Sequence, residues 1–317
     1  MIIAFCILTG FCVFYYNIPV RESAIEGATD YSWEKNKFYS RATEGFAWGK
    51  TNNEGYLNVF DYPKDEGVDI LVMGSSHMEA YQVAMDESTA AVLGGLLPDR
   101  TVYNIGASGH NFLVCADNLA AAVEKYRPSE YVIIETSGLL FSADQLRSAI
   151  DETVPDVSSV ADGIVGILQK NQFLRLLYAQ LESFNENSDS ANINTNSAVN
   201  DFEENEALYD ELLAKLSDTV TKNGAQLIVV YHPKFKLNKD GSASALNDEK
   251  LSVFFADICE KNAVSFLDMS DIFLREYQEN HILPHGFANS SVGTGHLNKN
   301  GHKMMANALY ELIKEEK

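Results

Sequence analysis

Residues 68–80 read Val-Asp-Ile-Leu-Val-Met-Gly-Ser-Ser-His-Met-Glu-Ala. All but one of the first six are apolar, a composition typical of a strand that is covered on both faces. Gly74 allows close approach of the backbone, and the polar triplet Ser75-Ser76-His77 ends the strand. In an open α/β sheet, ligands bind beyond the carboxyl ends of the strands. A serine there is either a nucleophile at the start of a helix or a simple helix cap, and this stretch alone fits both roles.

Short apolar runs alternate with helical patterns along most of the remaining chain. The expected strands cover residues 68–73, 101–105, 131–134, 226–231 and 264–267. The helical spacing of apolar residues predicts helices over 86–97, 112–126, 160–184, 202–222, 248–261 and 303–314. Such alternation is typical of a parallel sheet with helices on both faces. The sequence therefore predicts an α/β fold with three layers, α/β/α, around a mostly parallel sheet.

The chain divides into three expected parts. Residues 1–18 carry no charge, and a helix of that length, at about 1.5 Å per residue, just reaches across a hydrocarbon core of about 30 Å. We therefore expect an N-terminal apolar helix that is a membrane anchor or an uncleaved signal, with a buried core helix as the alternative. Residues 19–67 are expected to form an approach segment on the flank of the domain. Residues 68–317 form the domain itself, with an insertion around 140–222 that includes an Asn/Ser-rich surface excursion over 185–200.

The charge balance excludes two classes of electrostatic partner. The chain has 24 Lys and Arg against 45 Asp and Glu, which gives a formal net charge of −21. Nothing in this composition supplies a face that neutralises phosphate groups. Nucleic acids and the surfaces of anionic membranes are therefore not expected to bind by charge.

Neither a metal nor another cofactor is expected from the spacing of the ligating residues. The four cysteines lack metal-ligand spacing. Cys115 and Cys259 are expected as buried free thiols, with a disulfide between them as the alternative in an oxidising compartment. His281 and His285 have the spacing of a helical metal site, but Pro284 breaks the helix that such a site would need.

A second polar stretch lies near the other end of the chain, where residues 293–302 read Gly-Thr-Gly-His-Leu-Asn-Lys-Asn-Gly-His. This loop carries His296 directly before the expected last helix. A serine becomes nucleophilic at neutral pH only with the help of a base, and histidine is the side chain best suited to that task. His296 is therefore a candidate base for a serine of the first stretch.

Three short blocks together resemble the SGNH (GDSL-type) hydrolase superfamily over roughly residues 68–314. The blocks are residues 74–77, 104–109 and 296–301. The resemblance implies that Ser76 is the nucleophile and His296 is the base. It also implies that the N–H groups of Ser76 and Gly109 form the oxyanion hole.

Two departures from the family pattern concern the acid and one oxyanion donor. The family usually has an aspartate three residues before the base, where this chain has Gly293. Its third block usually ends in Gly-x-Asn-Asp, whereas this chain continues after Glu135 with Thr-Ser-Gly-Leu over 136–139. An active enzyme therefore needs another acceptor for the His296 ring. In order of preference, we expect a backbone carbonyl of residues 285–295, a side chain of residues 284–289, or a remote carboxylate such as Asp268 or Asp271.

First blocks of the Gly-Ser-Ser-His type resemble most the enzymes that add or remove O-acyl groups on bacterial surface polysaccharides. The resemblance implies a serine-dependent hydrolase or transferase of O-acyl esters, with acetyl as the expected group and a cell-surface carbohydrate or other small ester as substrate. Residues 1–18 would hold it at the extracytoplasmic face of a bacterial membrane, beside a membrane acyl-donor partner. The alternative is a catalytically inactive module of the same fold for carbohydrate binding or assembly. The expected pocket residues are Ser75, His77, His110, Asn111, His232 and His285. Glu79 is expected as a solvated carboxylate or as one that interacts with the dipole at the start of the helix.

Overall fold

The computed structural model describes residues 2–25, 31–152, 171–174, 176–177, 205–246 and 249–315. The expected surface excursion over 185–200 and most of the expected helix over 160–184 lie outside the described residues.

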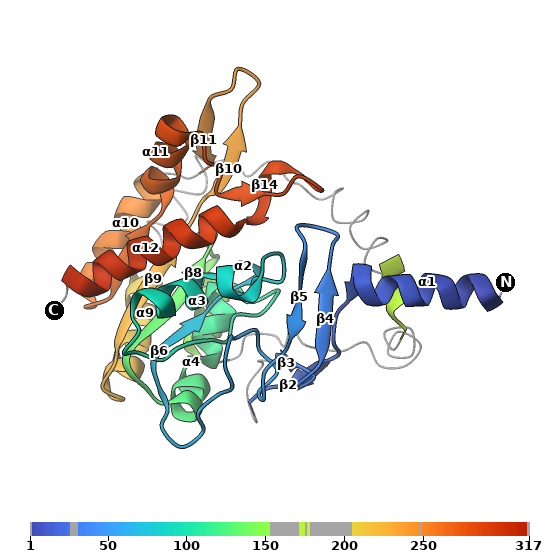
Figure 1. Cartoon of the computed structure of the whole chain (residues 1–317). Coiled ribbons are helices and arrows are strands. Elements are labelled where there is room, and N and C mark those ends of the chain that lie inside the picture. The colour runs from blue at the N-terminus through green and yellow to red at the C-terminus, as the bar shows by residue number, and fades with distance from the viewer. Residues whose placement is uncertain are drawn as a thin grey trace.

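The centre of the fold is a parallel sheet of five strands in the order β12-β9-β8-β6-β7 (Figure 1). These strands are β6 (Val68–Met73), β7 (Val102–Asn104), β8 (Pro128–Thr136), β9 (Gln226–Tyr231) and β12 (Ser265–Asp268). Each neighbouring pair is parallel. All five strands that the sequence predicts are therefore present, and the three-layer α/β/α architecture is confirmed.

Side chains of β6 alternate between two hydrophobic cores on opposite faces of the sheet. Leu71 packs in the core with helices α4 (Phe112–Tyr126), α5 (Ala143–Ile150), α9 (Glu206–Thr221) and α10 (Glu249–Lys261). Ile70 and Val72 pack in the core with α3 (Thr89–Leu96), α11 (Ser270–Asn280) and α12 (Lys299–Glu315). All three side chains are 0% exposed, which is why this strand reads as a nearly continuous apolar run.

The strand order reverses at β6, which lies between β7 and β8 although β7 comes next in the chain. Such a switch point opens a crevice at the carboxyl ends of the strands, because the two following connections leave in opposite directions. Ser76 begins the short helix α2 (Ser76–Glu79) directly after β6. Glu135 lies near the carboxyl end of β8, and His232 follows β9. The topology therefore brings these three residues to one edge of the sheet.

The approach segment, together with the two residues of β1 just before it, forms small antiparallel sheets that the sequence did not predict. Strands β1 (Tyr16–Asn17), β4 (Phe38–Arg41) and β5 (Ala47–Lys50) make one, and β2 (Arg21–Ser23) and β3 (Tyr31–Trp33) make the other. The aromatic residues Tyr31, Trp33 and Tyr39 pack in one cluster with Tyr81 and Ala107 of the main domain. These strands are only two to four residues long, too short for an alternating pattern to identify them.

The N-terminal helix α1 covers Ile2–Tyr15 and projects from the side of the molecule that carries β4 and β5 (Figure 1). It ends earlier than expected because Tyr16 and Asn17 leave the helix to pair with Arg41 and Ser40 of β4. Among the described residues, no helix is both long enough and apolar enough to cross a membrane.

Other differences from expectation lie in the second half of the chain. Strands β10 (Lys234–Leu237) and β11 (Ala243–Leu246) form a hairpin that the sequence did not predict. Helix α11 and the pair β13 (His285–Gly286) and β14 (Val292–Leu297) were not predicted. Cys115 and Cys259 are buried free thiols, as expected, and do not form a disulfide.

Candidate active site

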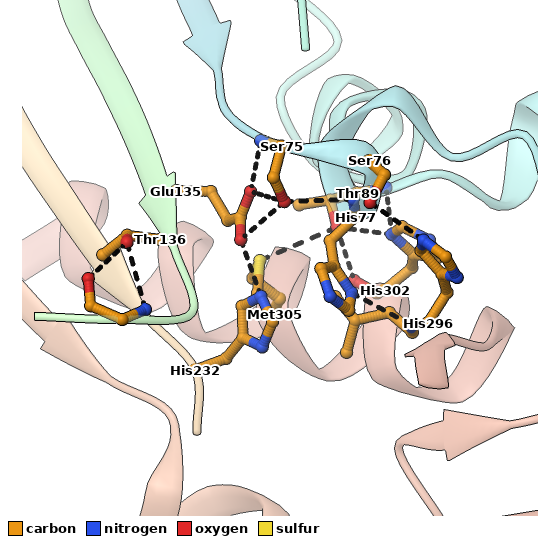
Figure 2. Close-up of polar contacts among 12 residues, drawn as sticks. Ser75, Ser76, His77, Thr89, Glu135, Thr136, His232, His296, His302 and Met305 are labelled. Atoms are coloured by element: carbon orange, nitrogen blue, oxygen red, sulfur yellow. Dashed lines mark hydrogen bonds and ion pairs between the residues drawn. The ribbon is translucent and has the colours of Figure 1, made fainter. Parts of the chain in front are cut away.

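Ser76 and His296 lie side by side although 220 positions separate them in the chain. The Nε2 atom of His296 is 2.8 Å from the Oγ atom of Ser76 (Figure 2). The helix cap is the neighbouring Ser75, whose Oγ accepts a hydrogen bond from the backbone N–H of His77 at 3.2 Å. The hydroxyl of Ser76 is therefore not used as a cap and faces the histidine.

The acceptor for the other ring nitrogen of His296 is Glu44. Its Oε2 atom lies 2.6 Å from His296 Nδ1, and its Oε1 atom accepts the backbone N–H of His296 at 3.0 Å. All three expectations for this acceptor, in residues 284–295 and at Asp268 or Asp271, are therefore wrong. Asp268 instead accepts the backbone N–H of Ser270 at 2.8 Å, which is a common role of an aspartate just before a helix.

Glu44 lies in the short connection between β4 and β5, in the segment that the sequence placed on the flank. The side chain of Asn289, which lies between β13 and β14, fixes this connection by hydrogen bonds. It accepts the N–H of Gly45 at 2.9 Å and donates to the carbonyl oxygens of Ala42 and Gly45 at 2.9 and 2.8 Å. A Cβ atom at Gly295 would lie 2.5 Å from Glu44 Oε1, so glycine is needed there for the carboxylate to approach.

The electrostatics favour an ionised Glu44. Burial raises its pKa, but the hydrogen bonds from His296 and the charge of that ring outweigh burial, and the net pKa lies below the ordinary value. An ionised carboxylate only accepts hydrogen bonds, so the Nδ1 atom of His296 carries the proton. The lone pair of Nε2 then faces Ser76. This arrangement lets His296 remove the proton of the Ser76 hydroxyl.

Glu135 holds the backbone just before Ser76. The carboxylate is 0% exposed and accepts the N–H of Ser75 at 2.7 Å and its hydroxyl at 2.9 Å. On its other side it lies 2.7 Å from Nε2 of His232, and Figure 2 shows it between these two partners. A Cβ atom at Gly74 would lie 2.6 Å from Glu135 Oε2, which explains the glycine at this position. Ser75 is thus a structural residue rather than the pocket residue that the sequence predicted.

The loop that carries Gly109 is tied to α2 through Glu79. Contrary to expectation, this carboxyl group is buried, at 2% exposure. It accepts hydrogen bonds from Trp33 Nε1 at 2.7 Å and from the hydroxyl of Ser108. The backbone carbonyl of Ser108 in turn accepts the hydroxyl of Tyr31 at 2.6 Å. The expected oxyanion residues Ser76 and Gly109 therefore belong to two segments that one buried carboxyl group connects.

We predict that Glu79→Gln changes how stability depends on pH. Burial raises the pKa of Glu79, although hydrogen bonds from Ser108 and Trp33 and the charges of Arg21 and Arg41 lower it in part. An acid whose pKa is higher in the folded chain stabilises that chain most at low pH, and the contribution is lost as pH rises through the folded pKa. The Tm of the wild type should therefore fall relative to that of Glu79→Gln between pH 4.5 and 8.

The amide of Glu79→Gln can keep both hydrogen bonds, because its oxygen accepts from Trp33 and its nitrogen donates to Ser108. A change of 1 kcal/mol shifts Tm by about 2–4 °C in domains of 150–250 residues, which differential scanning calorimetry resolves. Parallel Tm curves for the two proteins across this pH range would contradict the prediction.

A cavity of about 700 Å³ opens beside His296. Its walls include His77, Ser137, His232, Lys234, Phe235, Lys236, Leu246, His285, Thr294 and Gly295. Three expected pocket residues, His77, His232 and His285, thus line it, whereas His110 and Asn111 do not. His110 packs against Tyr31 with the ring centroids 5.3 Å apart. Asn111 caps α4 by accepting the N–H groups of Leu113 and Val114, an ordinary role of asparagine.

Several histidine rings around this cavity are held in the neutral form. Burial lowers the pKa of His77 well below its ordinary value, and the neighbouring histidines lower it further. Burial and the same neighbours lower the pKa of His285 to about 3. His302 lies deeper, where its Nδ1 atom is 2.9 Å from Thr89 Oγ1.

No protein-family model matches this sequence. Curated proteins give no match either. Among solved structures, a member of the lipolytic protein G-D-S-L family from Veillonella parvula is 12% identical, with a TM-score of 0.39, covering 77% of this chain and 97% of that chain. The acetyl xylan esterase AlAXEase is also 12% identical, with a TM-score of 0.44, covering 77% of this chain and 98% of that chain.

A two-domain esterase (CEX) active on acetylated mannans is 13% identical, with a TM-score of 0.40, and the match covers 78% of this chain and 49% of that chain. The G-D-S-L family is the superfamily that the three sequence blocks resemble. At this level of similarity, the chemistry of the site has to be judged from the residues of this chain.

Proposed function

We propose that this protein is a serine-dependent enzyme of the SGNH type that hydrolyses or transfers O-acyl groups. The observation that carries the proposal is the chain of two hydrogen bonds from Ser76 Oγ to His296 and from His296 to Glu44, at 2.8 and 2.6 Å. The alternative, an inactive binding module, rests on the missing acid and on the missing asparagine of the third block. The position of Glu44 beside His296 weighs against the first of these two arguments.

In the proposed reaction, His296 Nε2 takes the proton of the Ser76 hydroxyl while Oγ attacks the carbonyl carbon of the ester. The N–H groups of Ser76 and Gly109 are the proposed donors to the oxyanion that forms. Protonated His296 then returns the proton to the alcohol that leaves, and an acyl group remains on Ser76. Ionised Glu44 stabilises the imidazolium during both transfers.

Water or a sugar hydroxyl then attacks the acyl group, with His296 again as the base. We propose an acylated, typically acetylated, cell-surface carbohydrate as the substrate. The cavity supports this choice, because its volume lies within the usual range of about 300–1,000 Å³ for ligand sites. Its walls also carry the polar groups of Ser137, Thr294 and Lys234, which suit a hydroxylated ligand.

A fluorophosphonate probe tests the proposal, because it modifies only a serine that a base activates. We expect mass spectrometry to find one modified peptide, with the label on Ser76, and release of acetate from acetylated polysaccharides by the same protein. Adding sugar acceptors then separates hydrolysis from transfer, because a transferase forms acylated sugar. Label on another residue, or none together with no ester turnover, would refute the proposed function.

We further propose that residues 1–18 hold the protein at the extracytoplasmic face of a bacterial membrane. The proposal rests on the exposed apolar side chains of α1, among them Ile7 at 66% and Phe11 at 57% exposure. The full-length protein should therefore sediment with membranes, and Ile7→Glu with Phe11→Glu should move it to the soluble fraction. Val253→Glu, at an apolar position of α10 that is 62% exposed, is the matched control. Wild-type protein in the soluble fraction would contradict this prediction.

A further inference from the structure

Three histidine side chains from separate parts of the chain converge beside the candidate active site. His77 belongs to α2, His232 follows β9, and His285 belongs to β13. One ring nitrogen of each lies within 4.8 Å of one of each of the others. Among the residues that the structure describes, this is the one group of three or more ligating side chains at such distances.

We propose that His77, His232 and His285 form a binding site for a divalent transition-metal ion, with room in the cavity for a fourth ligand. The sequence did not predict this site, because its local spacing suggested only His281 with His285. Imidazole nitrogen is a preferred ligand of zinc and related metals. Three protein ligands plus an open position is the arrangement typical of catalytic zinc sites.

His232 has a ring nitrogen with a free lone pair. Its Nε2 atom lies 2.7 Å from Glu135 Oε1, and a carboxylate only accepts, so Nε2 carries the proton. The lone pair is therefore on Nδ1, which is buried and has no hydrogen-bond partner. Buried polar atoms without partners are rare in proteins, and an unseen ion is one of their explanations.

Glu135 gives His232 the environment that metal-binding histidines usually have. Such a histidine donates its other ring N–H to a carboxylate, a carbonyl or water, which sets the tautomer and the ring orientation. Figure 2 shows this contact, with the same carboxylate also holding Ser75. The ring thus cannot turn its free nitrogen away without breaking a buried hydrogen bond.

His285 is a second buried histidine with a ring nitrogen that can bind a metal ion. It is 3% exposed, and its Nδ1 atom also lacks a hydrogen-bond partner. Phe235 stacks on the ring with the centroids 6.3 Å apart, and Phe273 meets it edge-on at 5.5 Å. These two aromatic side chains hold the ring of His285 in place.

His77 has to give up one hydrogen bond to become the third ligand. Its Nδ1 atom accepts the backbone N–H of Leu297 at 3.2 Å, which places the ring proton on Nε2 and leaves neither nitrogen free. That distance is at the long end of the normal range, so the bond is weak and the metal can replace it. We therefore expect His77 to contribute less to affinity than His232 or His285.

Isothermal titration calorimetry with Zn²⁺ tests the site on the full-length chain, without a polyhistidine tag and after removal of metals with a chelator. We expect one ion per chain and a rise in Tm with Zn²⁺, because a ligand of the folded chain stabilises it. Cobalt(II) should give the visible absorption of a tetrahedral site. His232→Gln and His285→Gln should abolish these signals, and Glu135→Gln should weaken binding about 10–100-fold.

Two control variants test whether the loss of Zn²⁺ binding is specific to the three histidines. His281→Asn replaces an exposed histidine near the site in sequence and should bind as the wild type does. Ser76→Ala should also bind Zn²⁺ normally while it loses ester turnover, so failure of this site and failure of the proposed function are distinguishable. If a variant of the buried His232 or His285 fails to fold, His77→Gln still tests the site, because His77 is only half-buried and its loss should weaken the binding of Zn²⁺. No binding by the wild type, or binding unchanged in the folded variants, would overturn the proposal.

Discussion

Replacing Glu44 by glutamine is expected to lower the kcat of ester turnover about 10⁴-fold, the loss that follows when the acid of a serine protease triad becomes an amide. The reason is the tautomer of His296. The amide oxygen can accept the backbone N–H of His296, which the Oε1 atom now accepts at 3.0 Å. The amide nitrogen then faces Nδ1 as a donor, so the ring proton moves to Nε2 and the base toward Ser76 is lost.

Steady-state kinetics with a chromogenic acetate ester measures this loss, and Tm checks that the fold is retained. Glu87→Gln is the control, because Glu87 is a glutamate outside the site that lies 3.8 Å from Lys299. Its kcat should stay near the wild-type value. A kcat of Glu44→Gln within tenfold of the wild type would mean that another group orients His296.

Ser76→Ala is expected to cost more, about 10⁶-fold in kcat, as for the nucleophile of a serine protease. The variant removes the atom that would carry the acyl group, whereas Glu44→Gln leaves that atom in place. Its Tm should stay close to that of the wild type, because the Ser76 hydroxyl caps no helix and forms its hydrogen bond with His296.

Ser75→Ala should give the opposite pattern and is the matched control. It removes the cap of α2 and one hydrogen bond to Glu135. The loss of a helix cap typically costs about 0.5–2 kcal/mol in stability. Tm should therefore fall while ester turnover persists, since Glu135 still accepts the backbone N–H of Ser75. An inactive Ser75→Ala with an active Ser76→Ala would mean that the nucleophile is one residue earlier.

The sequence by itself determined the central sheet and one half of the candidate site. Strands such as β6 are buried on both faces, so their composition records their environment without reference to any partner. The connections between parallel strands return the chain to the same edge, so Ser76 after β6 and His232 after β9 had to lie at the same edge of the sheet. The polar loop before the last helix then identified His296.

Only the tertiary structure decided the acid and the surroundings of the site. Glu44 lies 252 positions from His296, in strands too short to show a period, and nothing in the local sequence links the two. Asn289, which fixes the connection that carries Glu44, is also far away in sequence, 244 positions from Gly45. The convergence of His77, His232 and His285 likewise depends on side-chain directions at three element ends. Local periodicity reports whether a residue is buried, whereas such contacts depend on how whole segments pack against one another.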